Sequence, residues 1–81
     1  MSTSINKPIQ VGAVFRGVSI NPVWFIWDSR RYNIKKTNYT WQSPQGSALI
    51  HHFSVSDEAN VYELAFNSKE MTWRLDKVLT E

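Results

Sequence analysis

The stretch from Pro22 to Trp41, PVWFIWDSRRYNIKKTNYTW, constrains the fold of this 81-residue chain more than any other. It holds three of the four tryptophans, two of the three tyrosines and four of the nine basic residues. Val23–Trp27 is apolar on both faces of an extended segment, and Asp28-Ser29-Arg30 has the composition of a hairpin turn. We therefore expect a β-hairpin over residues 22–41, with a cationic and aromatic second strand.

The second strand of this hairpin, residues 31–41, fits two registers. Tyr32 and Ile34 share one face, whereas Tyr39 and Trp41 have the opposite parity. A single bulge near residues 36–38 would bring all four side chains to one side. A continuous strand would instead leave Tyr39 and Trp41 outside, on the face of Lys35. The sequence does not choose between these registers.

The rest of the chain has the same pattern of short alternating segments separated by turn residues. Strands are predicted over 9–18, 48–55, 61–66 and 71–75, and the tail 76–81 favours a strand with a bulge near Lys77 over a helix. About six short strands without a helix predict an all-β antiparallel meander, strongly curled or closed into a small, partly closed barrel. Residues 1–8 are predicted to be a disordered N-terminal tail, and residues 9–81 a single small β domain.

Composition indicates where in the cell such a domain is expected. The chain has no cysteine, no leader-like apolar segment at its start and no apolar run near the roughly 20 residues of a membrane helix. We expect a soluble, cytoplasmic protein. A domain of this size buries only about 60% of its unfolded-chain surface, so the aromatic residues must supply a dense core.

The predicted hairpin contains one longer motif, Trp27-x-x-Arg30-Arg31-Tyr32-x-Ile34, followed by Tyr39 and Trp41. In this motif the chain resembles small uncharacterised bacterial domains, in which a tryptophan, a short turn and Arg-x-Tyr-x-aliphatic follow one another. Segments 61–66 and 71–75 are similar to the final hairpin of those domains, so the resemblance covers roughly residues 20–80. Because those domains have no assigned activity, the resemblance implies a bacterial all-β fold and no catalytic residue.

Charge is unevenly distributed along the chain. Residues 1–56 carry six basic side chains and one acid, whereas residues 57–81 carry three basic and six acidic side chains, which gives +5 against −3. An uneven distribution is compatible with an anionic partner. We favour the simpler interpretation that acidic strands lie beside basic ones and cancel their charge.

The basic and aromatic residues of the hairpin suggest two kinds of partner. Proteins that bind single-stranded nucleic acid combine cations that follow phosphates with rings on which bases stack. In a small domain, however, the same rings are needed in the core. An apolar face at Val23–Trp27 or an open sheet edge would instead bind another protein or a second copy of the chain. The predicted binding residues are Trp27, Arg30, Arg31, Lys35, Lys36, Tyr39 and Trp41.

The remaining polar residues give no catalytic pattern. His51 and His52 are adjacent in a predicted strand and therefore point to opposite faces. A structural zinc site needs about four converging ligands, and none is evident. No serine has the glycine setting of a nucleophile elbow. We expect a non-enzymatic binding or adaptor module without catalytic residues, metal or cofactor, which associates with protein. Single-stranded nucleic acid or another anionic partner is the alternative.

Overall fold

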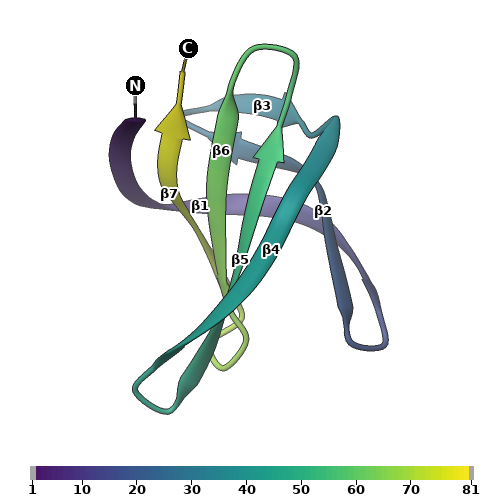
Figure 1. Ribbon diagram of the computed structural model, residues 1–81, viewed down its shortest axis with the longest axis vertical. Coiled ribbons are helices and arrows are strands. Elements are labelled where there is room, and N and C mark those ends of the chain that lie inside the picture. Colours follow the sequence, from purple (N-terminus) through teal and green to yellow (C-terminus); the bar gives the residue numbers. More distant parts are fainter. Residues whose placement is uncertain (1, 81) are drawn as a thin grey trace.

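The computed structural model describes residues 2–80, and every regular element in this range is a β-strand (Figure 1). Within these residues no helix is long and apolar enough to cross a membrane. The strands are β1 (Ser2–Arg16), β2 (Ser19–Trp27), β3 (Arg30–Asn33), β4 (Lys36–Gln45), β5 (Ala48–Ser56), β6 (Val61–Asn67) and β7 (Thr72–Leu79).

The strands form one antiparallel sheet with the order β3-β2-β1-β7-β6-β5-β4. All neighbours are consecutive in the chain except β1 and β7, whose pairing brings the two ends of the chain side by side (Figure 1). The predicted all-β antiparallel meander is confirmed, with seven strands rather than six. The prediction of a strongly curled sheet or a partly closed barrel is not supported, because the sheet is open and ends in β3 and β4.

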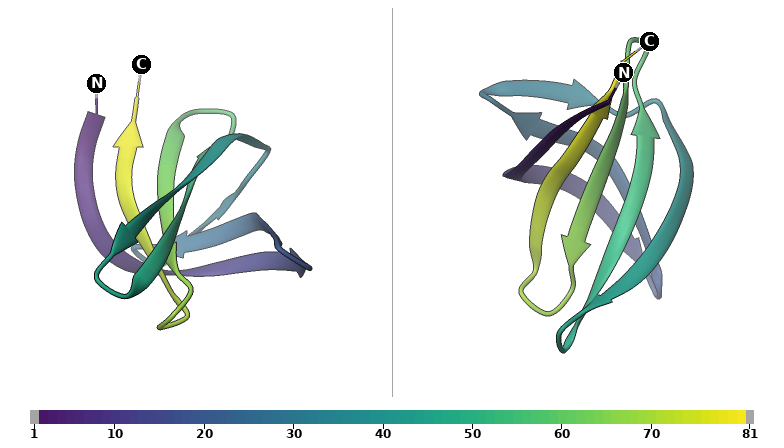
Figure 2. Two further views of the ribbon diagram at one scale, coloured as in Figure 1. Left: turned by 60° about the horizontal axis from the view of Figure 1, so that its bottom comes forward. Right: turned by 60° about the vertical axis from the view of Figure 1, so that its left-hand side comes forward.

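Strand β1 changes partner halfway along its length. Residues 2–9 pair with β7 and residues 10–16 pair with β2, and Figure 2 shows the strand bending between these two parts. The pairing with β2 shifts register between Gly12 and Ala13. Gly12 is needed there because an added Cβ would lie 2.1 Å from Cε2 of Trp24. A glycine inside a strand often marks such a bulge or bend.

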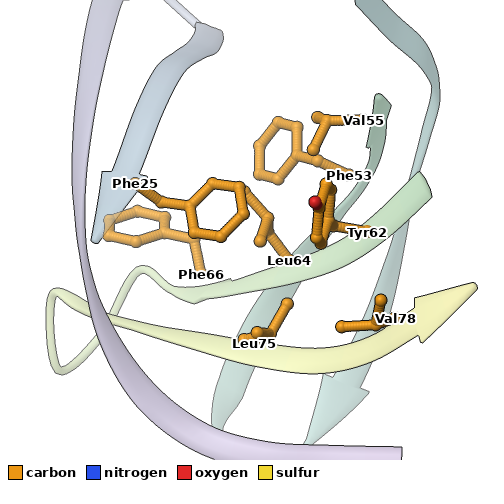
Figure 3. Close-up of a cluster of buried hydrophobic side chains, with 8 residues drawn as sticks. All are labelled: Phe25, Phe53, Val55, Tyr62, Leu64, Phe66, Leu75 and Val78. Atoms are coloured by element: carbon orange, nitrogen blue, oxygen red, sulfur yellow. The ribbon is translucent and has the colours of Figure 1, made fainter. Parts of the chain in front are cut away.

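Aromatic contacts hold β2 and β3 against β6. Phe25 of β2 is fully buried, stacks on Tyr32 with ring centroids 5.0 Å apart, and meets Tyr62 of β6 edge-on at 5.1 Å. Burial of each ring removes roughly 150–250 Å² of surface from water, which is a large share of the surface that so small a chain can bury. The core cluster consists of Phe25, Phe53, Val55, Tyr62, Leu64, Phe66, Leu75 and Val78 (Figure 3).

The predicted long strand over residues 31–41 is two strands. The amide of Ile34 donates to the carbonyl of Val23 at 3.0 Å, whereas the next amide, that of Lys35, donates to the carbonyl of Ser56 at 2.9 Å. Val23 belongs to β2 and Ser56 to β5, so the chain crosses from one edge of the sheet to the other at this point. The short link 34–35 therefore separates β3 from β4.

The bulge of one of the two possible registers is present, but it does not gather the four side chains on one side. The pairing of β4 with β5 shifts register between Thr37 and Tyr39. Tyr32 packs against the core, whereas Tyr39 is 62% exposed. Because β3 and β4 belong to opposite ends of the sheet, neither register proposed from the sequence describes residues 31–41.

The N-terminal end of the chain differs from the prediction, whereas the C-terminal end agrees with it. Residues 2–8, predicted to be a disordered tail, form the first half of β1 and pair with β7. At the other end the strand interpretation is confirmed through Leu79, with a register shift that leaves Asp76 as an extra residue in β7. Met1 and Glu81 lie outside the described residues.

The turn between β2 and β3 has the geometry that a tight hairpin requires. Trp27 pairs with Arg30, and the two loop residues, Asp28 and Ser29, have φ angles of 55° and 64°. Positive φ at both positions is typical of a type I′ turn, whose twist matches that of the flanking strands. The predicted turn is confirmed, and Ser29 occupies a position that favours glycine.

Candidate functional site

The seven predicted binding residues do not share one surface. Arg30, Arg31 and Lys35 border a cavity of about 440 Å³ that Asp57 and Glu58 also line. Four further residues lie elsewhere: Trp27 packs against the core, Lys36 begins β4, and Tyr39 and Trp41 follow along that strand. The predicted basic and aromatic binding face is therefore split into a charged part and an aromatic part.

The cations of the charged part already have partners within the chain. The guanidinium of Arg31 lies 4.7 Å from the ring centroid of Trp24, and that of Arg30 lies 5.9 Å from the ring of Tyr32. Lys35 Nζ lies 4.0 Å from Glu58 Oε1. Exposed ion pairs of this kind stabilise a fold little. They nevertheless place acidic side chains beside the basic ones, as the charge-cancelling interpretation expects.

The apolar segment Val23–Trp27 is also largely used within the fold. Phe25 is in the core, Trp27 packs against it, and Arg31 covers the ring of Trp24. Val23 is 38% exposed. This segment therefore does not present the open apolar face that the sequence suggested for protein binding.

The aromatic part is a row of three rings, Tyr39, Trp41 and His52, which we call the ring row. Trp41 and His52 are cross-strand partners on β4 and β5, and their rings are stacked with centroids 5.1 Å apart. The ring of Tyr39 lies 5.4 Å from that of Trp41 and is tilted by 36°. The next residue of β5, Phe53, points into the core, so the ring row lies on the opposite face, which we call the outer face.

Polar contacts fix the innermost ring of this row. His52 Nε2 lies 2.7 Å from Ser43 Oγ, and His52 Nδ1 lies 3.9 Å from Asp76 Oδ2. Arg74 Nε donates to the other oxygen of Asp76 at 2.6 Å. The His52 side chain is only 15% exposed, and its two ring nitrogens face Ser43 of β4 and Asp76 of β7.

The order Ser43, His52, Asp76 has the residue types of a catalytic triad but lacks its geometry. The separation between His52 and Asp76 is longer than a hydrogen bond. Ser43 lies within strand β4 and not on the sharp strand-to-helix turn that exposes a nucleophilic serine. These residues are therefore best explained as the support of the ring row.

No local pattern in the sequence indicates this support, because the partners of His52 come from two other strands, β4 and β7. Ser43 and Trp41 reach His52 through the register of β4 with β5, and Asp76 is an extra residue in β7. The prediction that His51 and His52 face opposite sides is confirmed, since the ring of His51 lies 6.2 Å from Phe66 of the core. Among residues 2–80 no three His, Asp or Glu side chains are grouped to hold a metal ion.

The carboxylate of Asp57 stabilises the turn between β5 and β6, in which this residue lies. Its Oδ1 accepts hydrogen bonds from the amides of Ala59 and Asn60, and its Oδ2 accepts one from the Tyr62 hydroxyl, each at 2.8 Å. Burial raises the pKa of Asp57, but the hydrogen bonds from Asn60, Ala59 and Tyr62 outweigh burial and hold that pKa below 3.8. Burial, together with the neighbouring Asp57, raises the pKa of Tyr62 to about 12.

The ring row belongs to the less protected of the two sheet edges. Strand β3 has four residues, two of which are arginines, whereas β4 has ten residues of which only Lys36 is charged. Natural sheets usually protect an edge by making it short or charged, so that it does not pair with another chain. The candidate site is therefore the outer face of β4, where the exposed Tyr39 and the half-buried Trp41 lie beside an edge whose only charge is Lys36.

Comparison of the chain with models of protein families, with curated proteins and with solved structures gives no match. The resemblance of the hairpin to small bacterial β domains thus stays a prediction, and the function has to be argued from the site alone.

Proposed function

We propose that the protein is a binding module that associates with protein through the outer face of β4. The observation that carries this proposal is the exposure of Tyr39, which is 62% accessible at the open end of the ring row on an edge strand. An exposed tyrosine that is not needed for the core, beside a tryptophan, is the side-chain combination enriched at protein interfaces.

The geometry of the ring row also supports binding because its rings are already ordered. Trp41 is stacked on His52, which in turn is held by Ser43. Ordering flexible side chains on association costs about 0.5–1.5 kcal/mol for each one. Rings that are fixed before a partner arrives avoid much of this cost, so the ring row is suited to act as an anchor.

Single-stranded nucleic acid is the second candidate, because Lys36 lies on the same strand as the exposed Tyr39 and the half-buried Trp41. The observations favour it less. Arg30, Arg31 and Lys35, which the sequence suggested as phosphate contacts, lie beside Asp57 and Glu58 and have partners within the chain. A nucleic-acid complex needs unpaired cations along the path of the bases.

Capture from a bacterial lysate tests the proposed function. The immobilised chain is compared with a Tyr39→Ala variant and with a Met71→Ala control, which changes a side chain that is 66% exposed in the turn between β6 and β7. We expect a protein that is retained by the control, lost with Tyr39→Ala, and insensitive to nuclease and to salt. Equal capture by both variants would contradict the proposal.

Salt separates the two candidates. A complex with nucleic acid weakens steeply as salt rises, in proportion to the number of phosphates contacted. Titration of the free chain with single-stranded DNA at low and high salt therefore completes the test. Tight, strongly salt-dependent binding that Tyr39→Ala abolishes would favour the second candidate over the first.

A further inference from the structure

We infer that the partner of β4 is a second copy of this chain, paired antiparallel with it edge to edge about a twofold axis at Trp41. This inference rests on the proposed function, which it deepens by naming the partner. It is based on the backbone N–H and C=O groups of β4 that point away from the sheet, and on the absence of charge in residues 37–45 of that strand.

Two hydrogen bonds of the neighbouring strand β5 determine which groups of β4 are free. The carbonyl of Ser56 accepts from Lys35 and so points towards β4, whereas the carbonyl of Leu49 accepts from Ser68 and points towards the β6 side. In an antiparallel sheet the N–H and C=O of one residue point the same way, and the direction alternates along the strand. Even-numbered residues of β5 therefore bond to β4, and odd-numbered residues do not.

The residue pairs between β4 and β5 then show which residues of β4 bond to β5. Trp41 pairs with His52 and Ser43 pairs with Ile50, so these two residues of β4 bond to β5. Thr40 and Gln42 pair with odd-numbered residues, and their N–H and C=O groups point away from the sheet. Pro44 belongs to the same outward set, which explains why a residue without an N–H is accepted there.

One antiparallel register uses all of the free groups of Thr40 and Gln42. With the axis at Trp41, Thr40 of each copy lies opposite Gln42 of the other, and each such pair exchanges both of its N–H···O bonds. Shifting the axis along the strand in one direction brings in Pro44, which has no donor. Shifting it in the other direction brings in the bulge between Thr37 and Tyr39.

The same register brings the ring rows of the two copies together. The two Trp41 residues face each other as a non-hydrogen-bonded pair, in which the Cα atoms are about 4.5 Å apart and side chains are closest. Tyr39 of each copy lies opposite Ser43 of the other. Aromatic cross-strand pairs contribute about 0.2–1 kcal/mol each to a sheet, so they add to the backbone bonds.

Charge favours a second copy at β4 and disfavours one at the other edge. Residues 37–45 carry no charge, so two copies of this segment meet without opposing like charges. Pairing two β3 strands would bring Arg30 and Arg31 of both copies together, and directly opposed like charges destabilise a sheet. The β4 contact involves few residues and lies at the small end of the range for protein interfaces, so we expect reversible, concentration-dependent dimers.

Sedimentation velocity over a wide range of concentration tests the inference. We expect the mass to rise from 9.4 kDa towards twice that value as the chain is concentrated. Thr40→Pro removes an outward N–H without removing a bond between β4 and β5, and should abolish the dimer. The matched control is Asn33→Pro on β3. The backbone N–H of Asn33 also points outward, because the next residue, Ile34, bonds to β2. This control should leave dimerisation unchanged.

Amide hydrogen exchange of the unmodified chain provides a test that does not depend on folding of the proline variants. Exchange at Thr40 and Gln42 should slow as concentration rises, while exchange at Asn33 stays constant. A monomer at every concentration, with fast exchange at Thr40 and Gln42 throughout, would overturn the inference. If such a monomer still captures another protein that Tyr39→Ala loses, only the self-pairing fails and the proposed function stands.

Discussion

The indole of Trp41 and the imidazole of His52 lie parallel, with an interplanar angle of 4° and ring centroids 5.1 Å apart. Trp41 belongs to the edge strand and His52 to the strand beside it, so the stack joins a half-buried ring of the edge strand to the interior of the sheet. The contact of His52 with Asp76 extends this connection to β7. The ring of Trp41 on β4 is thus positioned by residues of β5 and β7, which are distant from it in the sequence.

The variant His52→Ala tests this connection. Removing the imidazole eliminates the stacked pair, whose contribution beyond buried area is about 0.5–1.5 kcal/mol. The hydrogen bond to Ser43 and the buried area of the ring are lost as well, so we expect the free energy of unfolding to fall by more than the stacking contribution alone. The Trp41 indole should become mobile and more accessible. Urea unfolding gives the first quantity, and paramagnetic broadening of the Trp41 indole N–H resonance gives the second.

The control for this variant is His51→Ala, because His51 lies on the opposite face of the same strand near Phe66. It should leave the Trp41 resonance unchanged. A Trp41 indole that is equally accessible in both variants and in the original chain would show that His52 does not position it.

The turn between β2 and β3 predicts a stabilising substitution. Ser29 has a φ of 64°, a conformation that glycine adopts without the steric cost that a Cβ imposes. Ser29→Gly should raise the free energy of unfolding by roughly 0.5–1 kcal/mol, which thermal unfolding would detect as a higher Tm.

The opposite change in a second turn is the matched control. Gly46, between β4 and β5, has a φ of 60°, and a Cβ added there would meet no atom within 4 Å. Gly46→Ser should therefore lower Tm through backbone conformation alone. Equal Tm values for both variants and the original chain would contradict the turn geometry.

The carboxylate of Asp57 predicts a loss of stability in acid. Its pKa in the folded chain lies below 3.8, so its stabilising contribution is present above that ordinary value and is lost as the pH falls through the folded pKa. The free energy of unfolding, measured by urea titration at successive pH values, should decline below about pH 4. Asp57→Asn should reduce the acid-dependent part of this decline, whereas Glu58→Gln, at an exposed neighbour, should not.

Tyr62 predicts a second loss of stability in alkali. Its pKa rises from 10.0 to about 12 on folding, so its contribution is complete below pH 10 and is lost as the pH rises from 10 towards 12. Tyr62→Phe should abolish the part of the alkaline decline that comes from this hydroxyl and should remove a tyrosinate absorbance step near pH 12. An absorbance titration that is the same with and without Tyr62 would contradict the assignment.

Local patterns were enough to predict most of the strands. The apolar alternation of residues 61–66 and 71–75 corresponds to β6 and β7, and the turn at Asp28 and Ser29 follows from composition. The bulge near residues 36–38 belongs to one of the two registers that the sequence leaves open. In each case the signal lies within a few residues of the feature that it predicts.

Features that depend on distant partners could not be predicted in this way. The break at Ile34 and Lys35 arises because consecutive amides bond to Val23 and Ser56, which no local pattern reveals. That break places Tyr39 on the outer face and separates it from the arginines of β3. For the same reason the sequence grouped seven binding residues that the fold divides, and did not include His52.

Edge-to-edge pairing of two copies through β4 is accessible to nuclear magnetic resonance spectra of the backbone amides, recorded through a dilution series. We expect the resonances of residues 39–43 and of His52 to shift with concentration while those of residues 30–35 stay fixed. Constant resonances along β4 at every concentration, or shifts confined to residues 30–35, would overturn this pairing.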